Sequence, residues 1–330
     1  MSALKSKSFA VLALSVLTAG LLPVLLFPAL YGPDATGMAA GAACPFRLTS
    51  QFEQWIVIVT AFGIKPAYML ISLGLIVWLW RSVASDLSAL RWGLILFLAG
   101  ESACAFNYVA LGGGSELWEF LHDYGMVTGF SFVAWAVLEG LDRRIIKFDA
   151  AQDRCAALSL CRRCVKYDAT APCGLPRVFS MALLALLIVA LLPLGAPLQP
   201  LAYTTGINGL TVAYGASLST QWFMMRYCPA LAGALLAAAW LALRFRRGHS
   251  VATAKILLAA ALGPFGFGFL RLFLLAVFRN DLVWYNTWEE FTELLFILGV
   301  AFVLFVFRDA LFARQPAAAR SPGGPAPTSA

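Results

Sequence analysis

Four cysteines lie close together in one short basic segment. Their spacing is C-x5-C-x2-C-x8-C, and they are Cys155, Cys161, Cys164 and Cys173. Arginine and lysine side chains between them favour deprotonated thiols and offset the negative charge of a four-thiolate site. Zinc and an iron–sulfur cluster both accept four cysteine ligands, and the spacing does not choose between them. We therefore expect a metal centre here, and reduced thiols without a metal are the alternative.

A second set of polar residues lies inside apolar stretches, where a charged side chain is costly and usually marks function. Residues three or four positions apart share one face of a helix, so Glu119, His122 and Asp123 form one stripe. Glu290 and Glu293 form another. Glu101 lies near the middle of a third apolar stretch. We expect a catalytic site that consists of Glu101, Glu119, His122, Glu290 and Glu293. The candidates for binding a cofactor beside them are Lys65, Asn107 and Arg271.

Three interpretations of this second set stay open. Glu119-x-x-His122 with further carboxylates is similar to the ligand sets of di-metal carboxylate bundles, although those sites normally carry two such histidines. Alternatively, the residues relay protons or bind a polar substrate or a quinone head group, with Lys65 or Arg271 as counter-charge. In the third interpretation they are structural, because acids near helix N-termini are stabilised there and can pair with Arg226 and Arg271.

The elements that must position these residues are membrane-spanning helices. Hydrophobic residues make up 61% of the chain and charged residues 12%, which indicates a hydrocarbon solvent. The basic residues lie between apolar segments and do not form a nucleic-acid-binding face. We predict an all-α, polytopic membrane protein that contacts the lipid bilayer and no nucleic acid. Spans of about 20 apolar residues are predicted at 9–31, 53–80, 91–111, 116–140, 178–196, 222–245, 254–278 and 286–307.

The basic residues predict the orientation of these eight spans. Most lysines and arginines lie near the N-terminus, in 81–91, in 141–177, in 244–255 and after Arg308. Cytoplasmic loops carry such an excess, so we expect both termini in the cytoplasm of a multi-pass protein, on a bacterial inner membrane. The cysteine segment then lies in the cytoplasm, and most of the buried acids lie toward the external face.

The two halves of the chain show signs of a tandem duplication. Residues 54–81 and 221–244 both begin with Gln-Trp, contain Pro-Ala and end in arginine, and Glu119-Phe120 aligns with Glu290-Phe291. We predict a first four-helix repeat over 1–140, a cytoplasmic Cys-rich loop over 141–177, a second four-helix repeat over 178–310 and a disordered tail over 311–330.

These features lead to three hypotheses of function. The first is a membrane redox protein with an iron–sulfur or other thiolate-bound centre and an intramembrane site for a quinone, metal or protons. The two sites are about 30 Å apart along one helix, so electron transfer needs an additional cofactor, a soluble redox partner or another membrane subunit. The second is a transporter with a structural zinc in the cytoplasmic loop. The third is an anchoring or assembly subunit that docks a soluble partner.

Overall fold

The structure is a computed structural model of the chain, and it is described in several separate stretches. They are residues 46–80, 85–112, 115–145, 202–207, 210–215, 228–245, 250–278 and 281–312, with short pieces at 10–11, 13–14, 182–188 and 190. The segment with the four clustered cysteines, 155–173, and the predicted disordered tail lie outside these residues.

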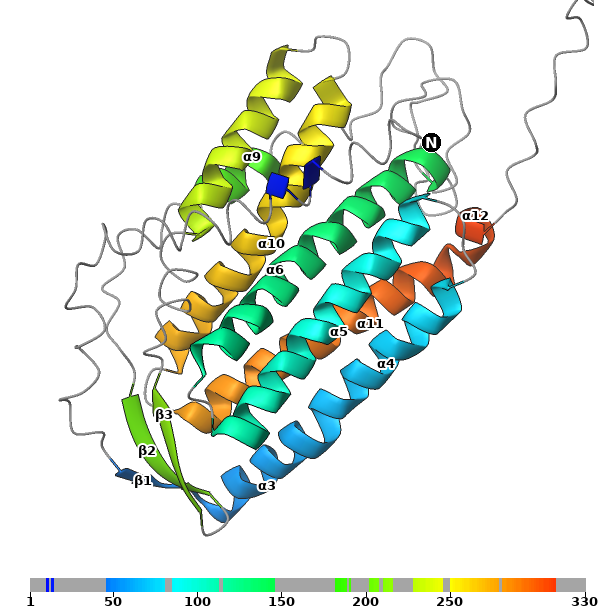
Figure 1. Cartoon of the computed structure of the whole chain (residues 1–330). Helices are drawn as coiled ribbons and strands as arrows, with labels where there is room; N and C mark the ends of the chain where they lie inside the picture. Colours follow the sequence, from blue (N-terminus) through cyan, green and yellow to red (C-terminus); the bar gives the residue numbers. More distant parts are fainter. Residues whose placement is uncertain are drawn as a thin grey trace, which may run out of the picture.

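Long helices make up most of the described chain. Their bounds are α3 (Gln51–Val59), η3 (Thr60–Ile64), α4 (Lys65–Leu79), α5 (Ser85–Leu111), α6 (Glu116–Gly140), η4 (Leu141–Ile145), α9 (Cys228–Phe245), α10 (Ser250–Val277), α11 (Leu282–Val306) and α12 (Arg308–Phe312). Figure 1 shows α4, α5, α6, α10 and α11 side by side in one bundle, with α9 against the first half of α10. Helix α11 contacts α4, although the two lie at opposite ends of the sequence.

The helical class predicted from the sequence is confirmed for this bundle. Helix α6 has the predicted bounds 116–140, and α4, α10 and α11 end within a residue or so of the predicted spans. Helix α5 begins at Ser85, six positions before the predicted start at 91. Its first turn carries Asp86, which is buried and forms an ion pair with Arg144. This ion pair stabilises a first turn that lies outside the apolar run. Most of the predicted spans 9–31 and 178–196 lies outside the described residues.

A small sheet lies at one end of the bundle, in segments predicted only as external loops. Strands β1 (Phe46–Leu48), β2 (Ala202–Ile207) and β3 (Leu210–Gly215) form it in the order β1-β2-β3. Strand β1 is parallel to β2, and β2 is antiparallel to β3. In sequence, Asn208-Gly209 separates the last two strands, and this dipeptide is typical of a two-residue hairpin turn. Figure 1 shows the sheet beside the start of α3.

The hydrophobic core lies between α4, α5, α6 and α11. Tyr68, Leu94, Phe97 and Met126 are completely buried there, and Trp135 is 1% exposed. A second, smaller core joins α9 to α10 and includes Leu183 of the short piece 182–188. The bundle is thus held by one main apolar core that extends sideways through α10.

Two described helical stretches are long and apolar enough to cross a membrane, judged by length and composition alone. They are Gln51–Leu79, with 29 residues and a mean hydropathy of 1.9, and Asp86–Leu111, with 26 residues and a mean hydropathy of 1.6. Two shorter apolar stretches are Cys228–Leu243 and Ala252–Gly268. Helices α6 and α11 carry several acids each.

Two buried ion-pair groups tie the helices together at the end opposite the sheet. Arg144 donates two hydrogen bonds to Asp86, of 2.5 and 2.8 Å, and one of 2.6 Å to the carbonyl of Leu311. Lys255 of α10 pairs with Glu139 at 3.0 Å and with Asp142. These contacts link α5, α6, α10 and α12 at the end where the sequence places its basic loops.

Candidate functional site

A π-helical turn precedes Lys65 in the helix formed by α3, η3 and α4. The helix begins with a capping box in which Ser50 and Glu53 bond each other's backbone N–H groups, at 3.2 and 2.7 Å. The N–H of Lys65 donates to the carbonyl of Thr60, five residues back. Pro66 follows, and because proline has no N–H, it fits at the start of the α-helical segment. π turns occur frequently at functional sites.

Lys65 is the centre of a buried ionic cluster between α4, α5 and α11. Its ammonium nitrogen lies 2.6 Å from a carboxylate oxygen of Glu101 and 2.8 Å from one of Glu290. The hydroxyl of Tyr68 lies 2.5 Å from oxygens of the same two carboxylates. Cys104 Sγ is 3.9 Å from the ammonium. One cation therefore holds two carboxylates, and one tyrosine proton is shared between them.

Glycines bring α5 and α6 into backbone contact beside this cluster. A Cβ atom on Gly125 would come within 2.5 Å of the Gly100 Cα atom, and one on Gly129 within 2.9 Å of the Phe97 nitrogen. Gly125 and Gly129 form the G-x-x-x-G spacing that lets helices approach closely in membranes. The contact places His122 Nδ1 3.1 Å from the carbonyl oxygen of Gly100.

His122 is held as a neutral imidazole by its two partners. The Gly100 carbonyl can only accept, so Nδ1 carries the proton and donates to it. An arginine can only donate, so Nε2 accepts from Arg271 Nη2 at 2.9 Å. Both ring nitrogens are therefore occupied. This disfavours the di-metal interpretation, because a metal would need a free lone pair on one of these nitrogens.

Arg271 of α10 is the centre of a second ionic cluster. Its guanidinium lies 2.8 Å from Glu289, 3.9 Å from Glu119 and 4.3 Å above the ring centre of Phe267. Asn107 extends this cluster, because its amide donates to Glu119 at 3.4 Å and its carbonyl accepts from the backbone of Ser115 at 3.1 Å. The second cluster thus reaches toward the loop between α5 and α6.

The two clusters form one network, because Glu101 Oε1 lies 3.7 Å from His122 Nδ1. Among the described residues, the network holds more carboxyl groups than cationic side chains. Its described acids are Glu101, Glu119, Asp123, Glu289, Glu290 and Glu293, and its described permanent cations are Lys65 and Arg271. A charge that is buried without compensation is expensive, so each of these carboxyl groups needs a cation or a proton.

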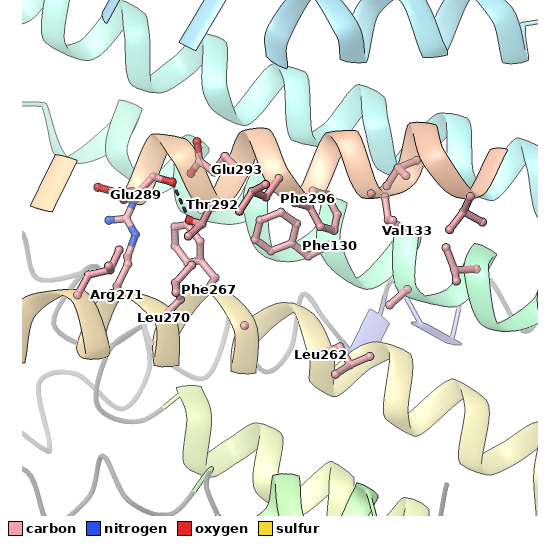
Figure 2. Close-up of a pocket in the computed structure, with 18 residues that line it drawn as sticks. Phe130, Val133, Leu262, Phe267, Leu270, Arg271, Glu289, Thr292, Glu293 and Phe296 are labelled. Atoms are coloured by element: carbon pink, nitrogen blue, oxygen red, sulfur yellow. Dashed lines mark hydrogen bonds and ion pairs between the residues drawn. The ribbon is translucent and has the colours of Figure 1, made fainter. Parts of the chain in front are cut away.

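An apolar cavity of about 590 Å³ lies between α6, α10 and α11. Figure 2 shows that Arg271, Glu289 and Glu293 lie toward one end of it, while Phe130, Val133, Leu262 and Phe296 line the remainder. The cavity exists because α10 contacts α11 at few positions but approaches α6 closely at Gly263, where a Cβ atom would overlap the Val127 carbonyl. The described residues thus form a polar network beside an apolar cavity.

All eight site residues selected from the apolar stretches of the sequence lie in this network or on its edge. Four additional members were not selected as site residues: Tyr68, Asp123, Glu289 and the Gly100 carbonyl. The spacing of three between Lys65 and Tyr68 was an available signal for one of them. Cys155, Cys161, Cys164 and Cys173 lie outside the described residues, so the proposed metal centre stays a prediction. Cys228 is completely buried, as expected for a small packing residue.

Comparison with protein-family models, curated proteins and solved structures finds no match to this chain.

Proposed function

We propose that the protein is a multi-pass integral membrane protein with about eight spans and both termini in the cytoplasm of a bacterial cell. The distribution of side chains supports this proposal. Leu70 of α4 is 67% exposed and Phe302 of α11 is 66% exposed, whereas Glu101 is completely buried. Apolar faces outside and ion pairs inside suit a lipid surrounding, where intramembrane charges face the bundle interior. In water the same faces would be an association surface.

The function we propose is redox chemistry with a lipid-soluble quinone bound between α6, α10 and α11. The observation that supports this function is the cavity, which is apolar for most of its length and ends at Arg271, Glu289 and Glu293. Its volume lies within the range of small-molecule sites. Glu289 and Val303 both line it, and their separation along α11 corresponds to about 21 Å. An isoprenoid tail fits the apolar part, and a quinone ring can reach the polar end.

The electrons in this proposal pass through the cytoplasmic loop. An iron–sulfur or other thiolate-bound centre at the four cysteines exchanges them with a soluble partner. Helix α6 runs from the network to the end of the bundle with the basic loops, so the distance is too long for one transfer step, and an additional carrier or membrane subunit must connect the two sites. Quinone carries both electrons and protons, which matches a site built from carboxyl groups.

Equilibrium binding of a short-chain quinone to detergent-purified protein tests the proposal, with quenching of tryptophan fluorescence as the readout. Gly299 lines the cavity, and a Cβ atom there meets nothing within 4 Å. Gly299→Leu should therefore fold and weaken binding by about tenfold or more. Gly74→Leu is the matched control, because Gly74 is equally open but lies on the exposed face of α4. Absence of saturable binding by the unaltered protein would refute the proposal.

The excess of carboxyl groups favours one second candidate, a proton- or cation-coupled transporter with a structural zinc in the cytoplasmic loop. In that case the network would load and release its neutralising cations during transport. Colourless purified protein with one zinc and no quinone binding would support the transporter. Broad visible absorbance that dithionite bleaches would support the redox protein.

A further inference from the structure

Glu293 belongs to two parts of the site at once. It lines the cavity, and its carboxylate also lies within 4.8 Å of the oxygens of Glu101 and Glu290. Its side chain is 6% exposed, and Oε2 is buried without a hydrogen-bond partner. Glu101 Oε1, in the same group, is buried and likewise has no hydrogen-bond partner. Two oxygens of this group therefore lack the donor that a buried carboxylate requires.

The three acids of α11 differ in their compensation. Glu289 pairs with Arg271 at 2.8 Å, and Glu290 pairs with Lys65 at 2.8 Å. No lysine or arginine in the described part of the chain lies within ion-pair distance of Glu293, and three other carboxyl groups stand near it. A like charge disfavours ionisation, and burial does the same. Lys65 already occupies the position between Glu101 and Glu290 that a metal ion would need.

We propose that Glu293 carries an exchangeable proton and passes it between a molecule in the cavity and the Lys65 cluster. The titratable groups of the network to which it belongs come from all five helices of the bundle. They are Lys65 and Tyr68 on α4, Glu101 and Cys104 on α5, Glu119, His122 and Asp123 on α6, Arg271 on α10, and Glu289 and Glu290 on α11. Burial, the unpartnered Oε2 and the nearby carboxyl groups of Glu101 and Glu290 make a neutral Glu293 the natural charge state.

The Tyr68 hydroxyl provides a route for this proton inside the network. It lies 2.5 Å from oxygens of both Glu101 and Glu290, and because it has one proton, it donates to one carboxylate at a time. A proton accepted by Glu290 from Glu293 can thus reach Glu101 through Tyr68. Glu101 lies 3.7 Å from His122, so the route ends beside the Arg271 cluster.

The chemistry of this inference rests on the proposed quinone site. Reduction of a quinone to a quinol takes two electrons and two protons. The two electrons would be supplied by the thiolate-bound centre of the proposed function. Glu293 gives one proton to a quinone oxygen and becomes a carboxylate. It is reprotonated by Glu290, whose side chain is 17% exposed and takes its proton from water, and it gives the second proton in the same way. Oxidation of a quinol runs these steps backward.

Infrared spectroscopy of the purified protein tests the inference without any quinone. A protonated carboxyl group has a carbonyl-stretch band that shifts in D₂O, and an ionised one does not have this band. At neutral pH the unaltered protein should show the band, and Glu293→Gln should lower its intensity. Glu139→Gln is the matched control, because Glu139 is a buried glutamate paired with Lys255 at 3.0 Å, and this variant should keep the band.

The outcomes separate this inference from the quinone proposal. Absence of the band in the unaltered protein, or its full intensity in Glu293→Gln, would overturn the inference whether or not quinone binds. Presence of the band in a protein that binds no quinone would keep the proton site and remove only the quinone. If Glu293→Gln does not fold, Glu293→Asp serves instead, and part of the band should then move in frequency. An unmoved band in Glu293→Asp would also overturn the inference.

Discussion

Lys65 on α4 and Glu290 on α11 are joined by an ion pair of 2.8 Å, although they are 225 positions apart in the sequence. Tyr68 donates to the same carboxylate from the next turn of α4. The pair fixes the relative position of two helices from opposite halves of the chain. It also places Glu293, one turn further along α11, between the ionic cluster and the cavity.

The Lys65–Glu290 pair should behave as a coupled buried pair. Lys65→Met alone leaves the negative charges of Glu101 and Glu290 uncompensated, so we expect the free energy of unfolding to fall by about 3–5 kcal/mol. Combining Lys65→Met with Glu290→Gln should cost less than the sum of the two single changes. Denaturant titration in detergent measures all three variants. Additive effects, within about 0.5 kcal/mol, would contradict the pairing.

The backbone contact between α5 and α6 should be sensitive to a single methyl group. Gly125→Ala places a Cβ atom 2.5 Å from the Gly100 Cα atom, so the helices must separate, at a cost of about 1–3 kcal/mol. The Gly100 carbonyl then also moves away from His122. Gly74→Ala is the control, because that position is open. It should leave stability unchanged or raise it by about 0.5–1 kcal/mol, since alanine favours helix. Equal melting temperatures for the two variants would refute the contact.

Arg144 should be sensitive even to replacement by lysine. Its guanidinium makes two hydrogen bonds to Asp86 and one to Leu311, and an ammonium group cannot reproduce this planar arrangement. We expect Arg144→Lys to lower the free energy of unfolding by about 1–3 kcal/mol. Arg308→Lys is the control, because Arg308 is 60% exposed and its partner Asp309 is 96% exposed. That change should stay within about 0.5 kcal/mol. The reverse order of effects would be inconsistent with the described contacts.

The cysteine loop should hold the metal of the protein. Cys161→Ser and Cys164→Ser should each reduce the bound metal, because a four-thiolate site loses one ligand in either variant. Elemental analysis and the visible absorption spectrum measure this loss. Cys104→Ser is the control, since Cys104 lies in the Lys65 cluster and should keep the metal content. Unchanged metal in both loop variants would eliminate the site.

Helical spacing predicted the polar stripes of the site but not how they meet. Glu119 and His122 share a face because α6 is regular from Glu116 to Gly140, and the same holds for Glu290 and Glu293 on α11. The partners of these residues depend on which helices touch, and this is decided by packing. The glycine contact of α5 with α6 and the gap between α10 and α11 are such features. They also set the two predicted repeats apart, because α5 packs tightly on α6, whereas their predicted counterparts α10 and α11 contact each other at few positions.

Tyr68 and the sheet were missed for different reasons. Tyrosine is common in apolar helices, so its role follows only from the two carboxylates that lie beside it. The strands β2 and β3 flank Asn208-Gly209. This dipeptide is a local hairpin signal, and it lies between two long apolar spans. The pairing of β1 with β2 joins residues more than 150 positions apart, and no local pattern encodes it.

The central claim is that a lipid-soluble quinone occupies the cavity between α6, α10 and α11. Photolabelling tests this claim most directly. A photoreactive quinone is added to membranes that contain the protein, and mass spectrometry locates the labelled residues. We predict labels on cavity-lining residues such as Leu270, Thr292 and Phe296, and we predict that excess unmodified quinone prevents them. Labels confined to the lipid-facing side of α4, or labels that excess quinone does not reduce, would contradict the claim.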